Sequence, residues 1–414
     1  MDLVIEGNLF IDGGIRKGCV GIDNGRIASI KKILEGDKHL DFGEKLIFPT
    51  GLDVHVHFRE PGHTEKEDFF TGTKAAALGG ITFVMDMPNN KPPAMSCFAI
   101  DEKIRIVRKK ACIDFALYGG IGRKSNVKMM AKRCKAFKTY LSGDNEIFTH
   151  PAKLRGALHR VKESGKVIAI HAESRECIKR GMSTSLSSHE KSRPVKCEIE
   201  TIKKILNANK GINANLHICH VSSPDSIMLL KENGINMGVT PHHMLLSTSS
   251  KFKLPAMGKV NPPLRKEEER KKIFNLVKNG FVDIIESDHA PHLPEEKDDF
   301  AAAPSGMPGV DTALPLMLEE VKKGDLPLSA VHRMLCKMPA ETFGINKGKI
   351  EVGRDADLLV IDFKEGKITP QSKCGWSSYE DRKGIYPLHV FLRGKDVVEN
   401  GQFIGNAGMG EMIA

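Results

Sequence analysis

The sequence predicts an α/β fold, a (β/α)8 barrel that carries a small accessory β domain. The middle of the chain alternates short apolar runs with helical stretches, a pattern typical of βα units around a parallel sheet. Eight such runs fall within about 300 residues, and eight parallel strands are the number that closes this kind of barrel. The two ends of the chain instead contain short, β-rich segments.

The two ends are predicted to pair into one small domain. The first 48 residues hold short alternating segments, and the Asp-Asn-Gly turn at residues 23–25 is a strong hairpin signal. The last part of the chain also consists of short alternating segments. Neither end has enough apolar surface to fold alone. We therefore predict a barrel over residues 49–345 and a composite β-sandwich domain formed by residues 1–48 and 346–414.

The eight predicted barrel strands follow one another along the chain, with helices between most of them. Helices are predicted over residues 67–78, 97–110 and 152–164. The strands are predicted to end near His57, Asp86, Gly119, Tyr140, His171, His220, Thr240 and Asp288. An open, doubly wound sheet is the alternative, but no GxGxxG motif follows the first barrel strand to support it.

Composition narrows the class of protein. Hydrophobic residues make up 40% of the 414 residues. No apolar run approaches the ~20 residues of a membrane span, and the N-terminus lacks a signal-peptide pattern. We therefore expect a cytoplasmic protein without a membrane partner. The net charge of +10 comes from lysines interleaved with glutamates, and aromatics are only 6%, so no nucleic-acid partner is expected. Nine scattered cysteines without a CxxC pair are expected to be reduced and buried.

Ionisable side chains recur where the predicted strands end, which is where a barrel of this type places its active site. His55 and His57 share one strand face with Cα atoms roughly 6.5 Å apart, so both imidazoles can bind one metal ion. Arg59 continues the same face, and its guanidinium can hold a carboxylate through two parallel hydrogen bonds. The alternative is two ordinary surface histidines followed by a loop salt bridge.

Three further strand ends offer metal ligands. His171 closes the apolar run "VIAIH". His217 and His220 are an odd number of residues apart, so only one of them can point into the barrel. We predict that His220, nearer the carboxyl end, is the ligand and that His217 is merely packed or exposed. Asp288 can bind a metal ion and carry a proton, and His292 follows on a loop with room to reach a bound ligand.

Lys138, in "AFKTYLSG", is predicted to point inward among these histidines. An ammonium group there would repel metal ions, and nearby cations together with desolvation favour the neutral amine. A neutral amine can capture carbon dioxide to form a carbamate, which is an anionic ligand able to bridge two metal ions. Spacing alone leaves this interpretation open.

Two long segments, "DVHVHFREPG" and "SDHAPHLPEEK", resemble the signatures of the dihydroorotase family within the amidohydrolase superfamily. The supporting motifs match that family in order: "MPNN", "FKTYLSG", "AIHAES", "ICHVSS", "VNPPLR" and "APSGMPG". The resemblance covers most of residues 49–345, and an accessory β domain at the two ends of the chain also agrees with the family.

The resemblance implies two zinc ions per chain, bridged by a carboxylated Lys138 and a hydroxide. Some relatives use an aspartate from a different position as the bridge, so the bridging group stays open. The remaining ligands would divide into two sets, His55, His57 and Asp288 for one ion and His171 and His220 for the other. The substrate contacts implied by the family are Arg59, Asn89, Asn261, His292 and the backbone of Ser305 and Gly306.

The activity implied by the resemblance is the reversible cyclisation of N-carbamoyl-L-aspartate to L-dihydroorotate with loss of water, a step of de novo pyrimidine (UMP) biosynthesis. Asp288 would take a proton from the attacking water and pass it to the leaving nitrogen. The alternative is a hydantoinase- or allantoinase-type cyclic amidohydrolase, whose allantoinase-like pattern tends to have asparagine where Arg59 stands. The expected partner is the small-molecule substrate, and a homo-oligomer or an association with another enzyme of the pathway is possible.

Overall fold

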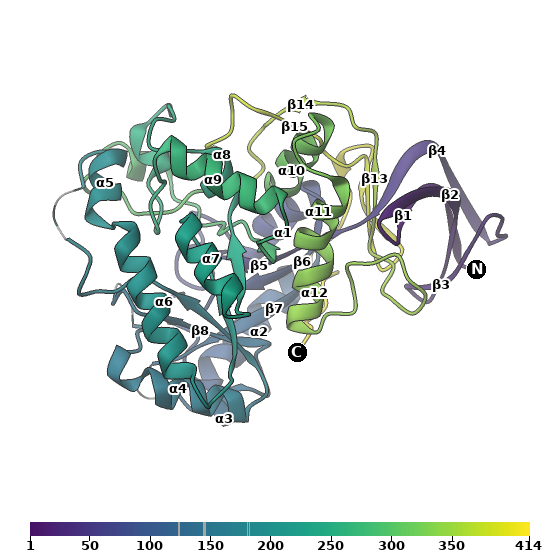
Figure 1. The fold of residues 1–414 in the computed structure, drawn as a ribbon. Helices are drawn as coiled ribbons and strands as arrows, with labels where there is room; N and C mark the ends of the chain where they lie inside the picture. Colours follow the sequence, from purple (N-terminus) through teal and green to yellow (C-terminus); the bar gives the residue numbers. More distant parts are fainter. Residues whose placement is uncertain (123–124, 144–145, 180, 182) are drawn as a thin grey trace.

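Two eight-stranded sheets form the framework of the protein (Figure 1). The computed structural model describes residues 1–122, 125–143, 146–179, 181 and 183–414. One sheet is the parallel barrel, and the other is assembled from strands near the two termini. No helix in this part of the chain is both long and apolar enough to cross a membrane.

The barrel strands pair in the order in which they occur along the chain, all of them parallel. A bridge between Val56 and His289 connects the first strand to the segment after the last one, and the His57 amide donates to the His289 carbonyl at 2.8 Å. The strands are β5 (Gly51–Val56), β6 (Ile81–Asp86), β7 (Asp114–Gly120), β8 (Ala136–Tyr140), β9 (Val167–His171), β10 (Asn215–Ile218), β11 (Asn236–Val239) and β12 (Ile284–Ile285).

These strands are buried almost throughout, as expected for a parallel sheet covered by helices. The prediction of the fold class is therefore confirmed, and most strands end within two residues of the predicted position. The last strand differs, because β12 pairs with β11 at only two positions and ends at Ile285. Asp288 follows three residues later, with a left-handed backbone (φ 49°) that turns the chain at the rim.

Helices cover the outside of the barrel, and their ends follow local capping chemistry. Asp68 caps α1 by accepting from the backbone amides of Phe70 and Thr71, so the helix begins at Phe69, two residues after the predicted start. The longer helices are α1 (Phe69–Leu78), α2 (Cys97–Lys110), α4 (Pro151–Glu163), α6 (Val195–Asn209), α7 (Pro224–Glu232), α9 (Glu267–Lys278) and α10 (Ala313–Lys322). The shorter ones are α3 (Val127–Met130), α5 (Leu186–Ser192), α8 (Pro241–Leu245), α11 (Leu328–His332) and α12 (Met338–Phe343).

The second sheet joins the two ends of the chain, because β13 pairs with β4 and so connects the C-terminal strands to the N-terminal ones. In Figure 1 it lies beside the barrel. Its strands are β1 (Leu3–Ile11), β2 (Gly14–Asp23), β3 (Arg26–Lys31), β4 (Lys38–Pro49), β13 (Leu358–Ile361), β16 (His389–Leu392), β17 (Lys395–Glu399) and β18 (Gln402–Phe403). The division of the chain into domains at residues 49 and 345 stays a prediction.

The cysteine prediction was wrong for one pair. Cys177 and Cys197 form a disulfide, whereas the other seven cysteines are free. The loop after β9 brings Cys177 to the first turn of α6, where the two Cα atoms lie 5.4 Å apart. Twenty residues separate the two cysteines along the chain, so only the folded loop reveals that they can bond.

The barrel and the C-terminal segment also meet in a buried ion cluster. Lys347 is fully buried and lies 2.8 Å from Asp114, at the start of β7, and 2.7 Å from Asp357, just before β13. Arg393 contacts Asp114 as well. A buried cation among carboxylates binds its neighbours firmly, because removing it leaves uncompensated buried charges.

We expect Lys347→Met to lower the free energy of unfolding by about 3–5 kcal/mol, because it leaves buried carboxylates unpaired. Denaturant titration measures the change. Lys349→Met is the matched control: Lys349 pairs with Glu341 at 2.8 Å near the surface, where such a pair contributes at most about 1 kcal/mol. Equal losses in the two variants would contradict the importance of the buried cluster.

Candidate metal centre and active site

A cavity of about 200 Å³ opens at the carboxyl ends of the barrel strands. Its wall brings together most of the predicted site residues from five strand ends and two loops. The lining residues are His55, His57, Arg59, Asn89, Tyr140, Ser142, His171, His220, Asn261, Asp288, Ala290, Ser305 and Gly306. Lys138 and His292, also predicted, are not in the cavity wall but contact residues that are.

The first ligand group consists of His55, His57 and Asp288. Alternation along β5 turns both imidazoles to the same side, and their Nε2 atoms lie 3.3 Å and 3.2 Å from Asp288 Oδ1. His57 Nδ1 lies 2.7 Å from Asn89 Oδ1, so the amide oxygen accepts from this nitrogen and leaves Nε2 free for a metal ion.

The second ligand group consists of His171 and His220. His171 Nδ1 and His220 Nε2 face each other at 3.2 Å. The other ring nitrogen of His171 lies 2.8 Å from a carboxylate oxygen of Glu173, which also accepts from Arg193 at 2.6 Å. His220 has a left-handed backbone (φ 37°), an uncommon conformation that brings its ring to the rim.

The spacing of the donor atoms fits a metal ion. Two nitrogens bound to one tetrahedral zinc ion at 2.0–2.1 Å lie about 3.4 Å apart. The facing nitrogens of His171 and His220, at 3.2 Å, are close to that separation, and so are the nitrogen–oxygen pairs around Asp288. Neutral imidazoles and a carboxylate are the donor types that zinc prefers.

Charges in the cavity also suit metal binding. Burial lowers the pKa of His57 to about 4, so its ring is neutral at physiological pH. Burial raises the pKa of Asp288, but the neighbouring His55 and His57 outweigh this effect and hold the carboxyl well below its usual range. The site therefore offers a neutral imidazole beside an ionised carboxylate.

Lys138 is fully buried on β8. Its Nζ lies 3.0 Å from Cys219 Sγ and 5.0 Å from the centre of the Tyr140 ring. Burial, then His171 and Lys138, hold the pKa of His220 well below its usual value. Burial and Lys138 also lower the pKa of His55, but Glu286 and Asp288 outweigh them and raise it to about 9. Lys138 thus lies near a histidine of each candidate ligand group, and its role as a ligand stays a prediction.

Arg59, which is predicted to hold a carboxylate, lines the cavity. Arg59 has a left-handed backbone (φ 62°), and its Nε donates to the Pro291 carbonyl at 3.1 Å. Its guanidinium lies 3.1 Å from His292 Nε2, so His292 orients the arginine. The Asn261 side chain is held in turn by His189, whose Nε2 lies 3.0 Å from Oδ1.

Sequence reasoning missed several buried polar groups of the site. Glu173 and Glu286 bind the candidate ligands from behind, and Cys219 contacts Lys138. Burial raises the pKa of the Cys219 thiol, but Lys138 and His55 lower it by more, to about 5. A glutamate inside the apolar run "VDIIESD" was a usable signal, because an unpaired buried carboxylate is costly.

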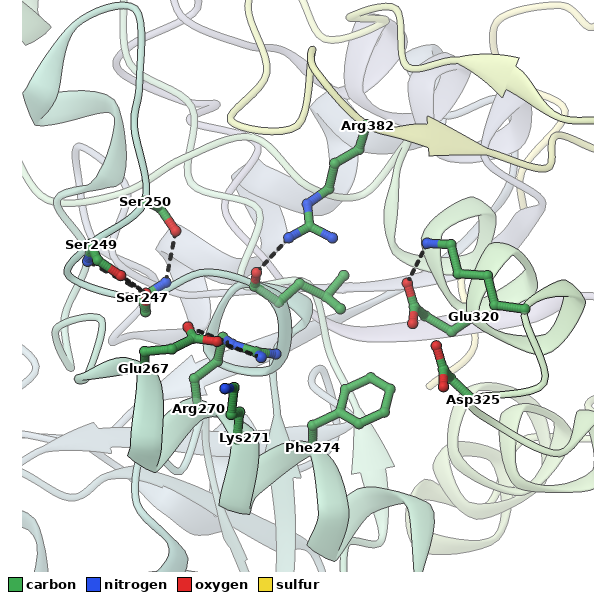
Figure 2. A pocket seen from close by; sticks show the side chains of 12 residues that line it. Ser247, Ser249, Ser250, Glu267, Arg270, Lys271, Phe274, Glu320, Asp325 and Arg382 are labelled. Atoms are coloured by element: carbon green, nitrogen blue, oxygen red, sulfur yellow. Dashed lines mark hydrogen bonds and ion pairs between the residues drawn. The ribbon is translucent and has the colours of Figure 1, made fainter.

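A second cavity, of about 490 Å³, lies beside α9 and Arg382 (Figure 2). It is larger, but most of its charged side chains already have partners. Arg270 forms a bidentate pair with Glu267 at 2.7 and 2.8 Å, and Arg382 donates to the Leu245 carbonyl at 2.6 Å. Converging donors distinguish an active site better than volume does, so the smaller cavity is the candidate.

Comparisons with known proteins agree with this geometry. A family model described as "Amidohydrolase family" matches residues 46–400. The dihydroorotase of Methanosarcina acetivorans is 34% identical, covering 98% of this chain and 93% of its own, and that of Thermoplasma acidophilum is 37% identical, covering 96% and 95%. Among solved structures, the L-hydantoinase (dihydropyrimidinase) from Arthrobacter aurescens superposes with a TM-score of 0.94 at 28% identity, covering 99% of both chains.

The fold and the site therefore define a hydrolase of the cyclic-amide type, and the chain belongs to the amidohydrolase family, within it to the dihydroorotases. A D-hydantoinase from a Thermus species is also similar in structure, with a TM-score of 0.90 at 25% identity over 99% of this chain and 98% of that one. The relatives in sequence are thus named dihydroorotases, whereas the solved structures with a similar fold are named hydantoinases.

We expect the purified protein to contain a divalent transition metal ion, detectable by elemental analysis. Replacing both His171 and His220 with alanine should lower the metal content per chain, because it removes both nitrogens of one ligand group. The exposed His159, 66% of whose side chain is accessible, gives the control His159→Ala, which should keep the wild-type content. Active protein without any such metal would contradict the assignment of the centre.

Proposed function

We propose that this protein is a zinc-dependent dihydroorotase, which interconverts N-carbamoyl-L-aspartate and L-dihydroorotate. The observation that supports the proposal most directly is the position of Arg59: it lines the same cavity as four histidines and Asp288. The substrate combines a free carboxylate with a cyclic amide, and the cavity offers a cation for the first and metal ligands for the second. Relatives named dihydroorotase, 31–37% identical, support the same function.

In this proposal two zinc ions occupy the centre, one held by His55, His57 and Asp288 and the other by His171 and His220. Bound zinc would supply Lewis-acid polarisation of the ring carbonyl and an activated water near neutral pH. The lowered pKa values of His57 and His220 and the observed donor spacings support this division. The number of ions is part of the proposal.

Asp288 is proposed to move the proton. Its carboxylate is ionised and faces the cavity beside both histidines of β5, so it can accept a proton from the attacking water and give it to the leaving ring nitrogen. In the direction of ring closure the same group acts in reverse. Turnover of Asp288→Ala near the wild-type rate would contradict this role.

The substrate carboxylate is proposed to bind His292 together with three further side chains, those of Arg59, Asn89 and Asn261. The three side chains line one cavity, and His57, His189 and His292 fix their orientation. The backbone of Ser305 and Gly306 lines the same wall and is proposed to contact the ring. Holding both ends of the substrate keeps the reacting atoms at a near-attack distance.

Lys138 is proposed to carry a carbamate that bridges the two ions. Its complete burial close to both ligand groups supports the assignment. We expect Lys138→Ala to be inactive and to regain part of its activity in acetate or propionate, because the added carboxylate supplies the bridging oxygens. Normal turnover of Lys138→Ala with two ions bound would contradict the bridging role.

An assay of the purified protein on dihydroorotate, hydantoin and allantoin tests the proposed substrate. Dihydroorotate should be hydrolysed most efficiently. A chelator should abolish the activity, and added Zn²⁺ should restore it. Preference for hydantoin would favour the alternative that the solved structures of hydantoinases suggest.

Arg59→Ala should lower kcat/KM for dihydroorotate by roughly 30- to 1000-fold, because a lost charge-assisted bidentate contact costs on the order of 2–4 kcal/mol. Arg59→Lys should recover only part of the rate, since the lysine ammonium group keeps the charge but cannot form the two parallel hydrogen bonds of a planar guanidinium. Hydrolysis of an uncharged ring should change little. An equal loss on both substrates would mean that Arg59 supports the loop and does not bind the carboxylate.

A further inference from the structure

Glu286 lies between the two ligand groups and is fully buried. One carboxylate oxygen accepts from the His220 backbone amide at 2.6 Å and lies 3.4 Å from His55 Nδ1. The other oxygen lies 3.0 Å from His217 Nε2. A single carboxylate therefore contacts one histidine of each proposed zinc site.

The contact with His55 defines which ring nitrogen faces the cavity. Its Nδ1 is buried and has no other partner among the described residues, and 3.4 Å is long for a hydrogen bond. A carboxylate at this nitrogen favours the tautomer that carries the proton on Nδ1. Nε2, which faces Asp288 at 3.3 Å, is then left with its lone pair for a metal ion.

The contact with His220 acts through the backbone. The left-handed conformation of this residue (φ 37°) is uncommon outside glycine. A 2.6 Å hydrogen bond from its amide to a buried carboxylate stabilises that conformation. The conformation in turn directs Nε2 towards His171.

The neighbouring strand β11 leaves room for this carboxylate. Gly238, on β11, lies opposite it, and a Cβ atom at this position would come within 2.5 Å of the Glu286 carboxyl group. His217 is held from its other side by Asn236, at 2.6 Å from Nδ1. Side chains from β10 and β11 thus leave a closely fitting space for one glutamate.

We propose that Glu286 is a positioning residue that orients a ligand of each zinc ion, His55 through its ring and His220 through its backbone. The inference rests on the proposed zinc centre. Groups that orient metal ligands from behind contribute about 10- to 100-fold to metal affinity. Because Glu286 contacts both ligand groups, its removal weakens the binding of both ions.

Glu173 provides a matched comparison. It is also a fully buried glutamate, but it contacts only His171 among the proposed ligands. Its removal is therefore expected to weaken one ion alone. Glu198 is a third buried glutamate, which binds the hydroxyls of Ser222 and Ser223 and contacts none of the proposed ligands.

The test measures zinc affinity by competition with a chromophoric chelator in the full-length protein and in Glu286→Gln, Glu173→Gln and Glu198→Gln. Glu286→Gln should weaken both ions by about 10- to 100-fold, Glu173→Gln one of them, and Glu198→Gln neither. The visible spectrum of the Co²⁺-loaded protein provides a second readout, which should change in Glu286→Gln because the ligand geometry changes.

The outcomes separate this inference from the proposed function. Wild-type protein that binds no zinc would overturn the centre itself. Wild-type protein that binds two ions, with unchanged affinities and an unchanged Co²⁺ spectrum in Glu286→Gln, would overturn only the role of Glu286. If circular dichroism shows that Glu286→Gln does not fold, Gly238→Ala decides instead: it crowds the carboxylate and should weaken both ions, and unchanged affinities would overturn the inference.

Discussion

The arrangement of the site depends on carboxylate and amide oxygens that contact the buried histidines at the rim of the barrel, through the rings of His55, His57 and His171 and through the backbone amide of His220. Asp288 faces the two histidines of β5, Glu173 holds His171, and Glu286 lies between His55 and His220. Burial alone would make such a cluster unstable, because polar groups removed from water need compensating partners. The acceptors at the rings of His55, His57 and His171 each lie at one ring nitrogen and leave the other free for the proposed metal ions.

The carboxylate clamp depends on parts of the chain that are distant in sequence. Trp376, from the C-terminal segment, donates to the His292 carbonyl at 2.7 Å, and Ser372 donates to Glu67 at 2.5 Å. These contacts brace the loops that carry Arg59 and His292. The C-terminal segment therefore contributes to the mouth of the site as well as to the second sheet.

A hydantoinase structure superposes on this protein almost over its full length, whereas the sequence relatives quoted above are dihydroorotases. Proteins with different names thus share one fold, so the fold alone does not select the substrate. The residues around the ring of the substrate make that selection. In the proposed function, the guanidinium of Arg59 distinguishes dihydroorotate from an uncharged ring.

The sequence by itself determined the barrel, its strand ends and most of the candidate ligands. Periodicity and apolar runs are local properties, and the carboxyl ends of parallel strands necessarily meet at one rim; His55, His57, His171 and Asp288 could therefore be predicted. The tertiary structure decided the contacts of Glu286, the burial of His217 and the bond between Cys177 and Cys197. A buried carboxylate or a disulfide is defined by partners from other strands and loops, and the distances to those partners exist only after the chain has closed into a barrel.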